Sequence, residues 1–194
     1  MGNLAFKAMS ITEFIAWESN QAGKHEYVDG EIFAMTDGTR GHDRVRNNIV
    51  MALGPHLRNT GCQLFGPEFG LRTDSNRARF YPDLFVTCKT NEIGEFEATS
   101  AKWVLEVLSP STQGRDRVEK WSVYREIPEL REYVLIDPAF WRIEIHRRAA
   151  TGDWALPTVS KPTEKVRFDS LDFEIAFGLI FEDVPEPPLE AGIV

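Results

Sequence analysis

Hydrophobic and polar positions along the chain follow two different periods, which predict both helices and strands. Ser10 and Glu13 have the spacing of a capping box, and apolar residues follow, so we expect a short helix there. The segments 25–28 and 31–34 read as two short strands on either side of Asp29-Gly30, a dipeptide typical of a two-residue hairpin turn. The chain should therefore begin with a helix and a β-hairpin.

One long helix and three strands are predicted in the centre of the chain. Apolar residues at helical spacing indicate a helix over 42–57, which Gly54-Pro55 should distort or end. Strands should follow over 63–72, 80–88 and 102–108. Loops rich in polar residues and glycine separate them, so we expect the first two to pair antiparallel.

The remaining pattern predicts one more helix and further strands. Ser109–Thr112 breaks the third strand and offers hydroxyl caps to a helix over 113–126, which Pro128 should stop. Strands are expected over 131–137 and 141–147, with weaker signals over 154–159 and 165–173. A helical crossover makes strands 102–108 and 131–137 parallel. The order predicts an α+β or mixed α/β fold.

Composition favours one soluble cytoplasmic domain over 1–194, with a loose tail at 185–194. The 194 residues contain no apolar run of membrane-spanning length, no signal-peptide pattern, and two cysteines, too few for a disulfide scaffold. A protein that coats nucleic acid without sequence specificity needs basic charge, so the net charge of −8 argues against that function. Between Arg40 and Arg125, however, 13 basic residues accompany 10 acidic ones, which permits an anionic substrate there.

Two carboxylates interrupt apolar strands. Asp83 lies near the start of one strand and Glu106 lies inside another. An uncompensated carboxylate in such a place costs several kcal/mol, so it must pair, lose its charge or bind a cation. For either residue alone, a structural ion pair is the ordinary explanation. Two on adjacent strands, about 4.8 Å apart, favour a shared oxygen-rich site suited to Mg²⁺ or Mn²⁺.

Pro82-Asp83 followed by Glu106-Val107-Leu108 resembles the PD-(D/E)XK nuclease superfamily. Over about 11–180 the chain more closely resembles the bacterial Uma-two family of proposed endonucleases, first catalogued as a domain of unknown function. The stretches that carry this resemblance are HEYVDGE at 25–31, His42, Tyr81-Pro82-Asp83, VLEVLSPST at 104–112, and Asp116 through Lys120 and Tyr124 to REYVLIDP at 131–138.

The resemblance implies a restriction-endonuclease-like core. This core consists of a helix, a three-stranded antiparallel meander, a crossover helix and a strand. The N-terminal helix and hairpin and the C-terminal strands would be additions to it.

The resemblance also implies a displaced lysine. The superfamily's usual lysine lies two residues after the glutamate, where this chain has Leu108. In its place, Lys120 on the following helix is expected to reach the site. Asp116, Lys120 and Tyr124 are spaced by four and share one helical face. The alternative is a solvated lysine paired with Asp116.

The implied activity is metal-assisted hydrolysis of DNA phosphodiester bonds. Asp83, Glu106 and the backbone carbonyl of Val107 would hold Mg²⁺ or Mn²⁺, which activates a water. Lys120 would orient that water or neutralise charge on the phosphate. His42 is a further catalytic candidate, with a surface histidine as the alternative. Glu31 is a candidate ligand, although glutamates beside turns are common.

Other residues weigh less. Candidates for contacts with DNA phosphates, each alternatively a solvated charge, are Arg44, Arg46, Arg115, Arg117 and Arg125. Cys62 and Cys88 lack CxxC spacing, which disfavours a zinc or redox site. Neither a GxGxxG nor a Walker A motif occurs, so no nucleotide cofactor is expected.

The sequence leaves two alternative functions and one possible oligomer, a homodimer, to be tested. The chain is alternatively a non-catalytic nucleic-acid-binding or protein-interaction module, or a metal-dependent enzyme acting on RNA or a small phosphorylated substrate. Convergence of Asp83, Glu106 and Lys120 within about 4–6 Å would favour catalysis. The apolar segment 173–181 is a candidate homodimer interface, with core packing as the alternative.

Overall fold

The structure is a computed structural model, and it describes residues 9–35, 38–73, 75–110, 113–155, 158–159 and 163–187. Its helical elements are α1 (Ile11–Glu18), α2 (Arg40–Leu57), α3 (Gln113–Arg115), a π-helical segment (Asp116–Lys120), α4 (Trp121–Tyr124) and α5 (Phe177–Ile180), with short 3₁₀ turns at Thr90–Glu92 and Asp169–Leu171. The strands are β1 (His25–Val28), β2 (Glu31–Ala34), β3 (Gln63–Phe65), β4 (Gly70–Arg72), β5 (Ala78–Phe80), β6 (Leu84–Thr87), β7 (Glu97–Ala98), β8 (Trp103–Val107), β9 (Glu132–Asp137), β10 (Arg142–Arg147), β11 (Thr158–Val159), β12 (Lys165–Phe168) and β13 (Phe173–Ala176).

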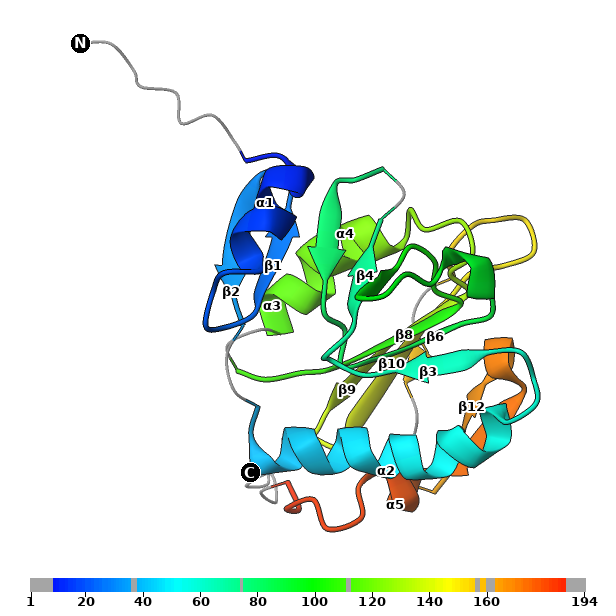
Figure 1. Ribbon diagram of the computed structural model, residues 1–194. Coiled ribbons are helices and arrows are strands. Elements are labelled where there is room, and N and C mark those ends of the chain that lie inside the picture. The colour runs from blue at the N-terminus through cyan, green and yellow to red at the C-terminus, as the bar shows by residue number, and fades with distance from the viewer. Residues whose placement is uncertain are drawn as a thin grey trace.

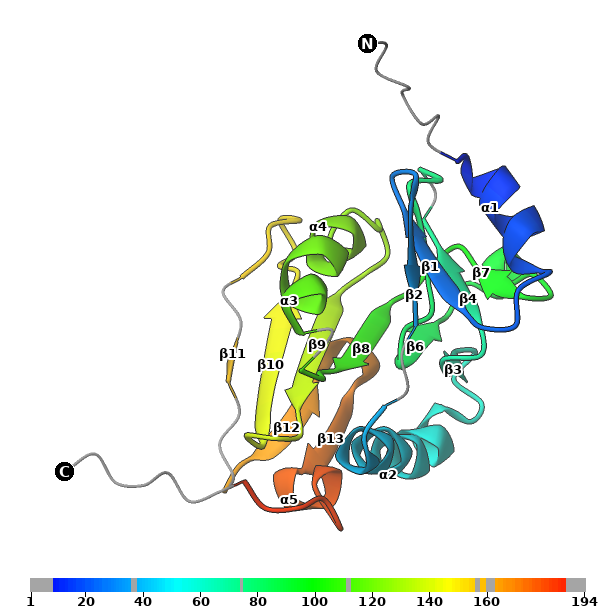
Figure 2. The ribbon, with the colours of Figure 1, turned by 90° about the vertical axis from the view of Figure 1, so that its left-hand side faces the viewer.

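The strands form two main sheets and a separate hairpin (Figures 1 and 2). The smaller sheet has the order β2-β1-β5-β4-β7, and the larger has the order β11-β10-β9-β8-β6-β3. Strands β12 and β13 pair with each other. The tripeptide Tyr81-Pro82-Asp83 joins β5 to β6 and so carries the chain from the smaller sheet to the larger one.

Alternating side chains of β8 pack into two different cores. Trp103, Leu105 and Val107 belong to the core that includes α2, α5 and the β12–β13 hairpin. Val104 and Leu108 belong to the core that includes α4 and β5. Figure 2 shows these two groups of elements on opposite sides of the larger sheet. Because side chains alternate along a strand, Glu106 faces the second group, which contains the helix following β8.

Several predicted elements are confirmed. The side chain and backbone of Ser10 form a capping box with Glu13 at the start of α1. Strands β1 and β2 form the predicted hairpin. Strands β8 and β9 pair in parallel through the helical crossover, with Leu105 opposite Val134. The mixed α+β fold class is confirmed in the same way by the two sheets and their helices.

Two of the predicted central strands are broken. The predicted strand 63–72 divides into β3 and β4, and the strand 80–88 divides into β5 and β6. Pro67 and Pro82 lie in the two interruptions, where a missing N–H cannot join a ladder. The predicted antiparallel pairing persists, but it is shared between the two sheets, because β3 pairs with β6 and β4 pairs with β5.

The helices differ from the prediction at their ends. Pro55 lies inside the last turns of α2, which continues to Leu57. The helical segment after β8 ends at Tyr124 and contains a π-helical turn. The predicted strand 165–173 becomes β12 and the first residue of β13. The predicted caps Ser111 and Thr112, and the predicted tail beyond residue 187, lie outside the described residues.

Cys62 and Cys88 are joined by a disulfide, which the sequence analysis did not anticipate. Antiparallel pairing of β3 with β6 brings them together, because each cysteine lies beside one end of this pair. Their separation of 26 residues gave no motif from which the contact could be recognised.

In the part of the chain that the structure describes, no helix is both long enough and apolar enough to cross a membrane.

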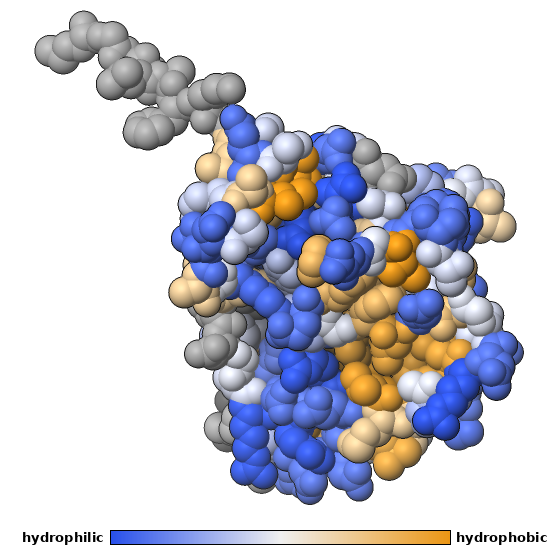
Figure 3. Space-filling model, in the orientation of Figure 1, coloured by the Kyte–Doolittle hydropathy of each residue, from blue (hydrophilic) through white to orange (hydrophobic). Residues whose placement is uncertain are grey.

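The proposed dimer segment 173–181 mostly packs into the core. Phe177, Ile180 and Phe181 are buried, which leaves Leu179 as its large exposed apolar side chain. A different apolar area surrounds β3 on the face shown in Figure 3, where Leu64 and Phe65 line a hollow. Strand β3 is an edge strand of three residues, so its free edge is short.

Candidate active site

Asp83 and Glu106 are neighbours across the β6–β8 pair. The antiparallel register sets Leu84 opposite Leu105, and one residue further along Asp83 faces Glu106. The backbone N–H of Asp83 lies 3.4 Å from Oε2 of Glu106, and the N–H of Val107 donates to Oδ2 of Asp83 at 2.7 Å. The structure therefore brings together the two carboxylates that interrupt the apolar strands.

His42 joins this pair from the first turn of α2. The Thr39 side chain caps the helix by accepting the backbone N–H of His42 at 3.2 Å. This cap fixes the first turn, and the His42 ring then places Nε2 3.1 Å from Oδ2 of Asp83. His42 is a neighbour of the carboxylate Asp83 rather than an isolated surface histidine.

Lys120 reaches Glu106 from the helical segment after β8. Its Nζ lies 3.1 Å from Oε1 of Glu106 and 3.3 Å from Oδ1 of Asp116. Lys120 is the last residue of the π-helical segment, and its side chain is 8% exposed. Leu108 occupies the usual lysine position and is buried in the core on the same face of β8. The ammonium group thus approaches the strand from the helix that covers that face.

Glu26 is a site residue that the sequence analysis missed. Its Oε1 lies 2.9 Å from Nζ of Lys120, and Arg115 donates to its Oε2 at 2.9 Å. Glu26 lies in β1 and is 3% exposed. A carboxylate in a strand beside Tyr27 and Val28 is the same signal that drew attention to Glu106. The predicted strand 25–28 is so short that a charged residue in it did not stand out.

Tyr124 completes the predicted helical face. Its hydroxyl donates to Oε1 of Glu106 at 3.0 Å, so that oxygen is held by both Tyr124 and Lys120. Tyr133 donates to the backbone carbonyl of Asp116 at 3.0 Å and anchors the π-helical segment to β9. The orientation of Glu106 is therefore set by groups on the helix.

Burial and charge act in opposite directions on the two central groups. Burial raises the pKa of Glu106 well above its usual value, and the negative charges of Asp116, Asp83 and Glu26 add to this against the opposing charge of Lys120. Burial lowers the pKa of Lys120, but Glu106, Glu26 and Asp116 together raise it well above the usual value. Lys120 is consequently held as a cation.

These side chains line a cavity of about 90 Å³. Its walls are Glu26, Ala34, Met35, Gly38, His42, Tyr81, Asp83, Glu106, Val107, Ser109, Arg115, Asp116 and Lys120. Liquid water occupies about 30 Å³ per molecule, so the cavity has room for a small ion and a few waters or for one phosphate-sized group. A whole nucleotide would extend beyond it.

Five sequence candidates lie outside this cavity, and one of them, Arg125, is exposed directly after α4. Glu31 is exposed beside the hairpin turn, at the end of β2 away from Ala34. Three of the candidate arginines form ion pairs away from the cavity: Arg44 pairs with Asp183, Arg46 with Asp43 and Arg117 with Glu144. Of the predicted phosphate-contacting arginines, Arg115 lines the cavity.

Comparisons with known proteins identify a family to which the chain is similar. The sequence model of the Uma2 family, described as "Putative restriction endonuclease", matches residues 11–178. Two uncharacterized proteins of Synechocystis sp. are 28% and 27% identical to this chain. The alignments cover 91% and 84% of it, and 93% of each relative.

A solved structure shares the fold. It is a protein from Anabaena variabilis described as a putative nuclease belonging to DUF820, and it aligns with a TM-score of 0.73 at 16% identity. The alignment covers 89% of this chain and 97% of that one. The predicted restriction-endonuclease-like fold is thereby confirmed. Since the family match spans most of the sequence, this chain belongs to the Uma2 family.

Proposed function

We propose that this protein is a Mg²⁺- or Mn²⁺-dependent endonuclease that hydrolyses DNA phosphodiester bonds at the cavity around Glu106. The observation that carries the proposal is the meeting of Lys120 with Glu106, which in turn faces Asp83. Lys120 and Glu106 lie within the range over which charges couple strongly, and the negative charge of Asp83 contributes to the raised pKa of Glu106.

The oxygen atoms at the site suit a hard cation. Oδ2 of Asp83 contacts His42 and Val107, and among the described residues no hydrogen bond or ion pair engages its Oδ1. Oε2 of Glu106 has one long contact, with the N–H of Asp83. These two oxygens and the backbone carbonyl of Val107 are our proposed ligands.

The number of protein ligands agrees with the chemistry of magnesium. In the described ranges, no three His, Cys, Asp or Glu side chains form a metal-binding group. Mg²⁺ usually keeps several waters and binds through one or two carboxylates together with substrate phosphate. Four carboxylates line the cavity with two permanent cations, Lys120 and Arg115, so the surrounding charge favours an added cation.

The proposed division of work follows from the contacts. A bound divalent ion would polarise the phosphate and acidify a water. Lys120, kept protonated by its carboxylate partners, would neutralise charge that develops on the phosphate. His42 would hold Asp83 in position, and Tyr124 would do the same for Glu106.

The size of the cavity matches the reacting phosphate of a substrate. About 90 Å³ accommodates the reacting phosphate and leaves the adjoining nucleosides outside. The family description, "Putative restriction endonuclease", supports DNA as the substrate.

The experiment that tests the proposal is nicking of supercoiled plasmid with Mg²⁺, with Mn²⁺ and with EDTA. Wild type should nick with either metal, and Asp83→Asn should not. Glu144→Gln is the matched control, because Glu144 is also a buried, ion-paired carboxylate on the larger sheet but lies on β10. Nicking by Asp83→Asn at the wild-type rate would overturn the proposal. Cleavage of labelled RNA but not of DNA would show that the substrate is RNA.

A further inference from the structure

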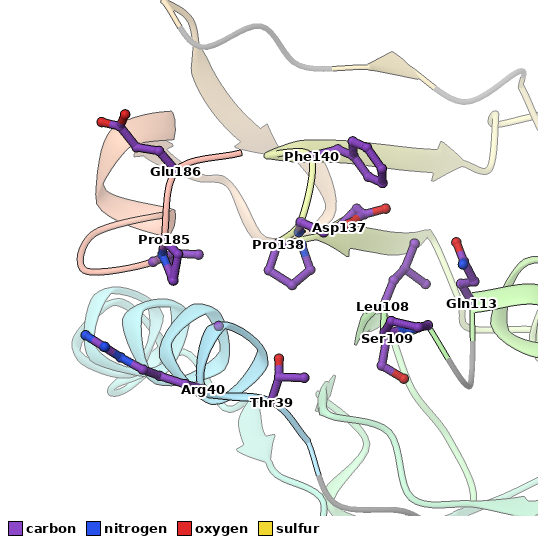
Figure 4. Close-up of a pocket in the computed structure, with 14 residues that line it drawn as sticks. Thr39, Arg40, Leu108, Ser109, Gln113, Asp137, Pro138, Phe140, Pro185 and Glu186 are labelled. Atoms are coloured by element: carbon purple, nitrogen blue, oxygen red, sulfur yellow. Dashed lines mark hydrogen bonds between the residues drawn. The ribbon is translucent and has the colours of Figure 1, made fainter. Parts of the chain in front are cut away.

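A second, larger cavity adjoins the catalytic one. It measures about 440 Å³ and lies where β8 and β9 end, between those ends, the start of α2 and the segment 184–186 (Figure 4). Ser109 lines both cavities, and His42 follows directly after Thr39–Gly41, which forms one wall. Ligands of open α/β sheets bind outside the carboxyl ends of parallel strands, which is the position of this cavity.

Contacts within the chain hold the walls of the second cavity in place. The indole N–H of Trp141 donates to the carbonyl of Pro185 at 3.1 Å and so ties the start of β10 to the C-terminal segment. A Cβ on Gly41 would lie 3.5 Å from Pro138 and 3.6 Å from Val184, so α2 packs closely against two other walls. The cavity is therefore a preformed feature of the fold.

The lining combines an apolar surface with polar groups. Leu108, Pro138 and Phe140 supply apolar contacts, and Phe140 is 68% exposed. Figure 4 shows the Asp137 carboxylate and the Gln113 amide toward the same side of the cavity as the Phe140 ring. Asp137 is 8% exposed, and its Oδ1 accepts the N–H of Ala139 at 3.0 Å, which fixes the direction of the carboxylate.

We propose that this cavity binds one unpaired nucleobase of the nucleic acid whose phosphate enters the catalytic cavity, a proposal that rests on the function proposed above. An exposed aromatic ring beside a hollow suits stacking, which every base can supply. The Asp137 carboxylate accepts hydrogen bonds, so it favours bases that carry an exocyclic amino group, namely adenine, cytosine and guanine. Thymine has no amino group and should bind more weakly.

The experiment measures nucleotide binding to the metal-free full chain by calorimetry or NMR titration, with no cleavage step. The probes are dAMP, dCMP, TMP and deoxyribose 5-phosphate. We expect dAMP and dCMP to bind more tightly than TMP, and deoxyribose 5-phosphate to bind most weakly. Phe140→Ala should weaken dAMP binding roughly 5- to 100-fold, the range that loss of one base–aromatic stack implies.

Phe96→Ala is the matched control, because Phe96 is 69% exposed and does not line the cavity. Asp137→Asn should reduce the preference for dCMP over TMP while stacking persists. Equal binding of deoxyribose 5-phosphate and dAMP, or unchanged binding by Phe140→Ala, would overturn the proposal. The binding test involves no cleavage, so the two proposals can fail separately. Nicking of DNA without base binding would overturn only the proposed base site. Base binding without nicking would overturn only the proposed nuclease function.

Discussion

The ammonium nitrogen of Lys120 lies 3.1 Å from Oε1 of Glu106, although one residue belongs to a helical segment and the other to β8. The position that would carry a lysine on the strand itself is occupied by Leu108, which is buried in the core. Under the proposed function, the ammonium group of Lys120 would act on the substrate phosphate from the helix instead of from the strand.

Replacing Lys120 by methionine should reduce nicking about 10²- to 10³-fold, the usual effect of losing one group that stabilises transition-state charge. It should also destabilise the fold by about 3–5 kcal/mol, because buried carboxylates lose their cation. Rates are measured on plasmid under single-turnover conditions, and stability by urea unfolding.

The double variant Lys120→Met with Glu26→Gln separates these two effects. Neutralising Glu26 removes one of the carboxylates that contact Lys120, so stability should partly recover while activity stays low. Recovery of activity together with stability would show that Lys120 acts through the fold alone.

His42→Ala should lower the nicking rate or Mn²⁺ affinity about 10- to 100-fold, as expected when a group that orients a metal ligand is removed. His42→Gln keeps a side-chain N–H near Oδ2 of Asp83, so it should retain more activity than the alanine variant. Rates and Mn²⁺ binding isotherms measured for both variants check this. Equal loss in the two would argue against positioning of Asp83 by a hydrogen bond.

Metal affinity should still rise with pH above the range in which an ordinary glutamate titrates. Burial and neighbouring carboxylates raise the pKa of Glu106, so the metal-free site holds a proton at pH values where an ordinary glutamate has lost it. A cation must displace that proton, and the competition weakens as pH rises through the raised pKa. Calorimetry in buffers of different ionisation enthalpy measures the protons released. Mn²⁺ binding without proton release at the lower pH would contradict this.

Reduction of the Cys62–Cys88 disulfide should lower stability. A link that closes a loop with a separation of 26 residues is worth about 3–4 kcal/mol in the chain-entropy description. Cys88 is exposed, so dithiothreitol should reach the bond. We expect a lower Tm in reductant for wild type and no response from the double variant Cys62→Ala, Cys88→Ala. An unchanged wild-type Tm would show that the link contributes little.

The sequence predicts local structure and the strand carboxylates better than it predicts contacts between distant segments. The Ser10–Glu13 capping box is encoded within four residues, and the parallel β8–β9 pair follows from the crossover between them. The division of the sheet depends on Pro67 and Pro82, whose effect on hydrogen bonding is visible only when the partner strands are known. For that reason two strands were predicted as continuous.

The site shows the same limit. Asp83 and Glu106 can be recognised in the sequence because charges are costly in apolar strands. Glu26 lies on a third strand, and its contact with Lys120 depends on how the smaller sheet packs beside the crossover helix. The disulfide likewise depends on the pairing of β3 with β6. Each of these contacts requires a tertiary arrangement that no local pattern specifies.

The central claim is that Glu106 belongs to a hydrolytic metal site and is not merely part of a buried ion pair. The most direct measurement compares Mn²⁺-dependent nicking of supercoiled plasmid by wild type and Glu106→Gln, with the Tm of both recorded. We expect wild type to nick and the variant to remain inactive, with its Tm unchanged or raised because a buried carboxylate is gone. Nicking by Glu106→Gln at the wild-type rate would contradict the account.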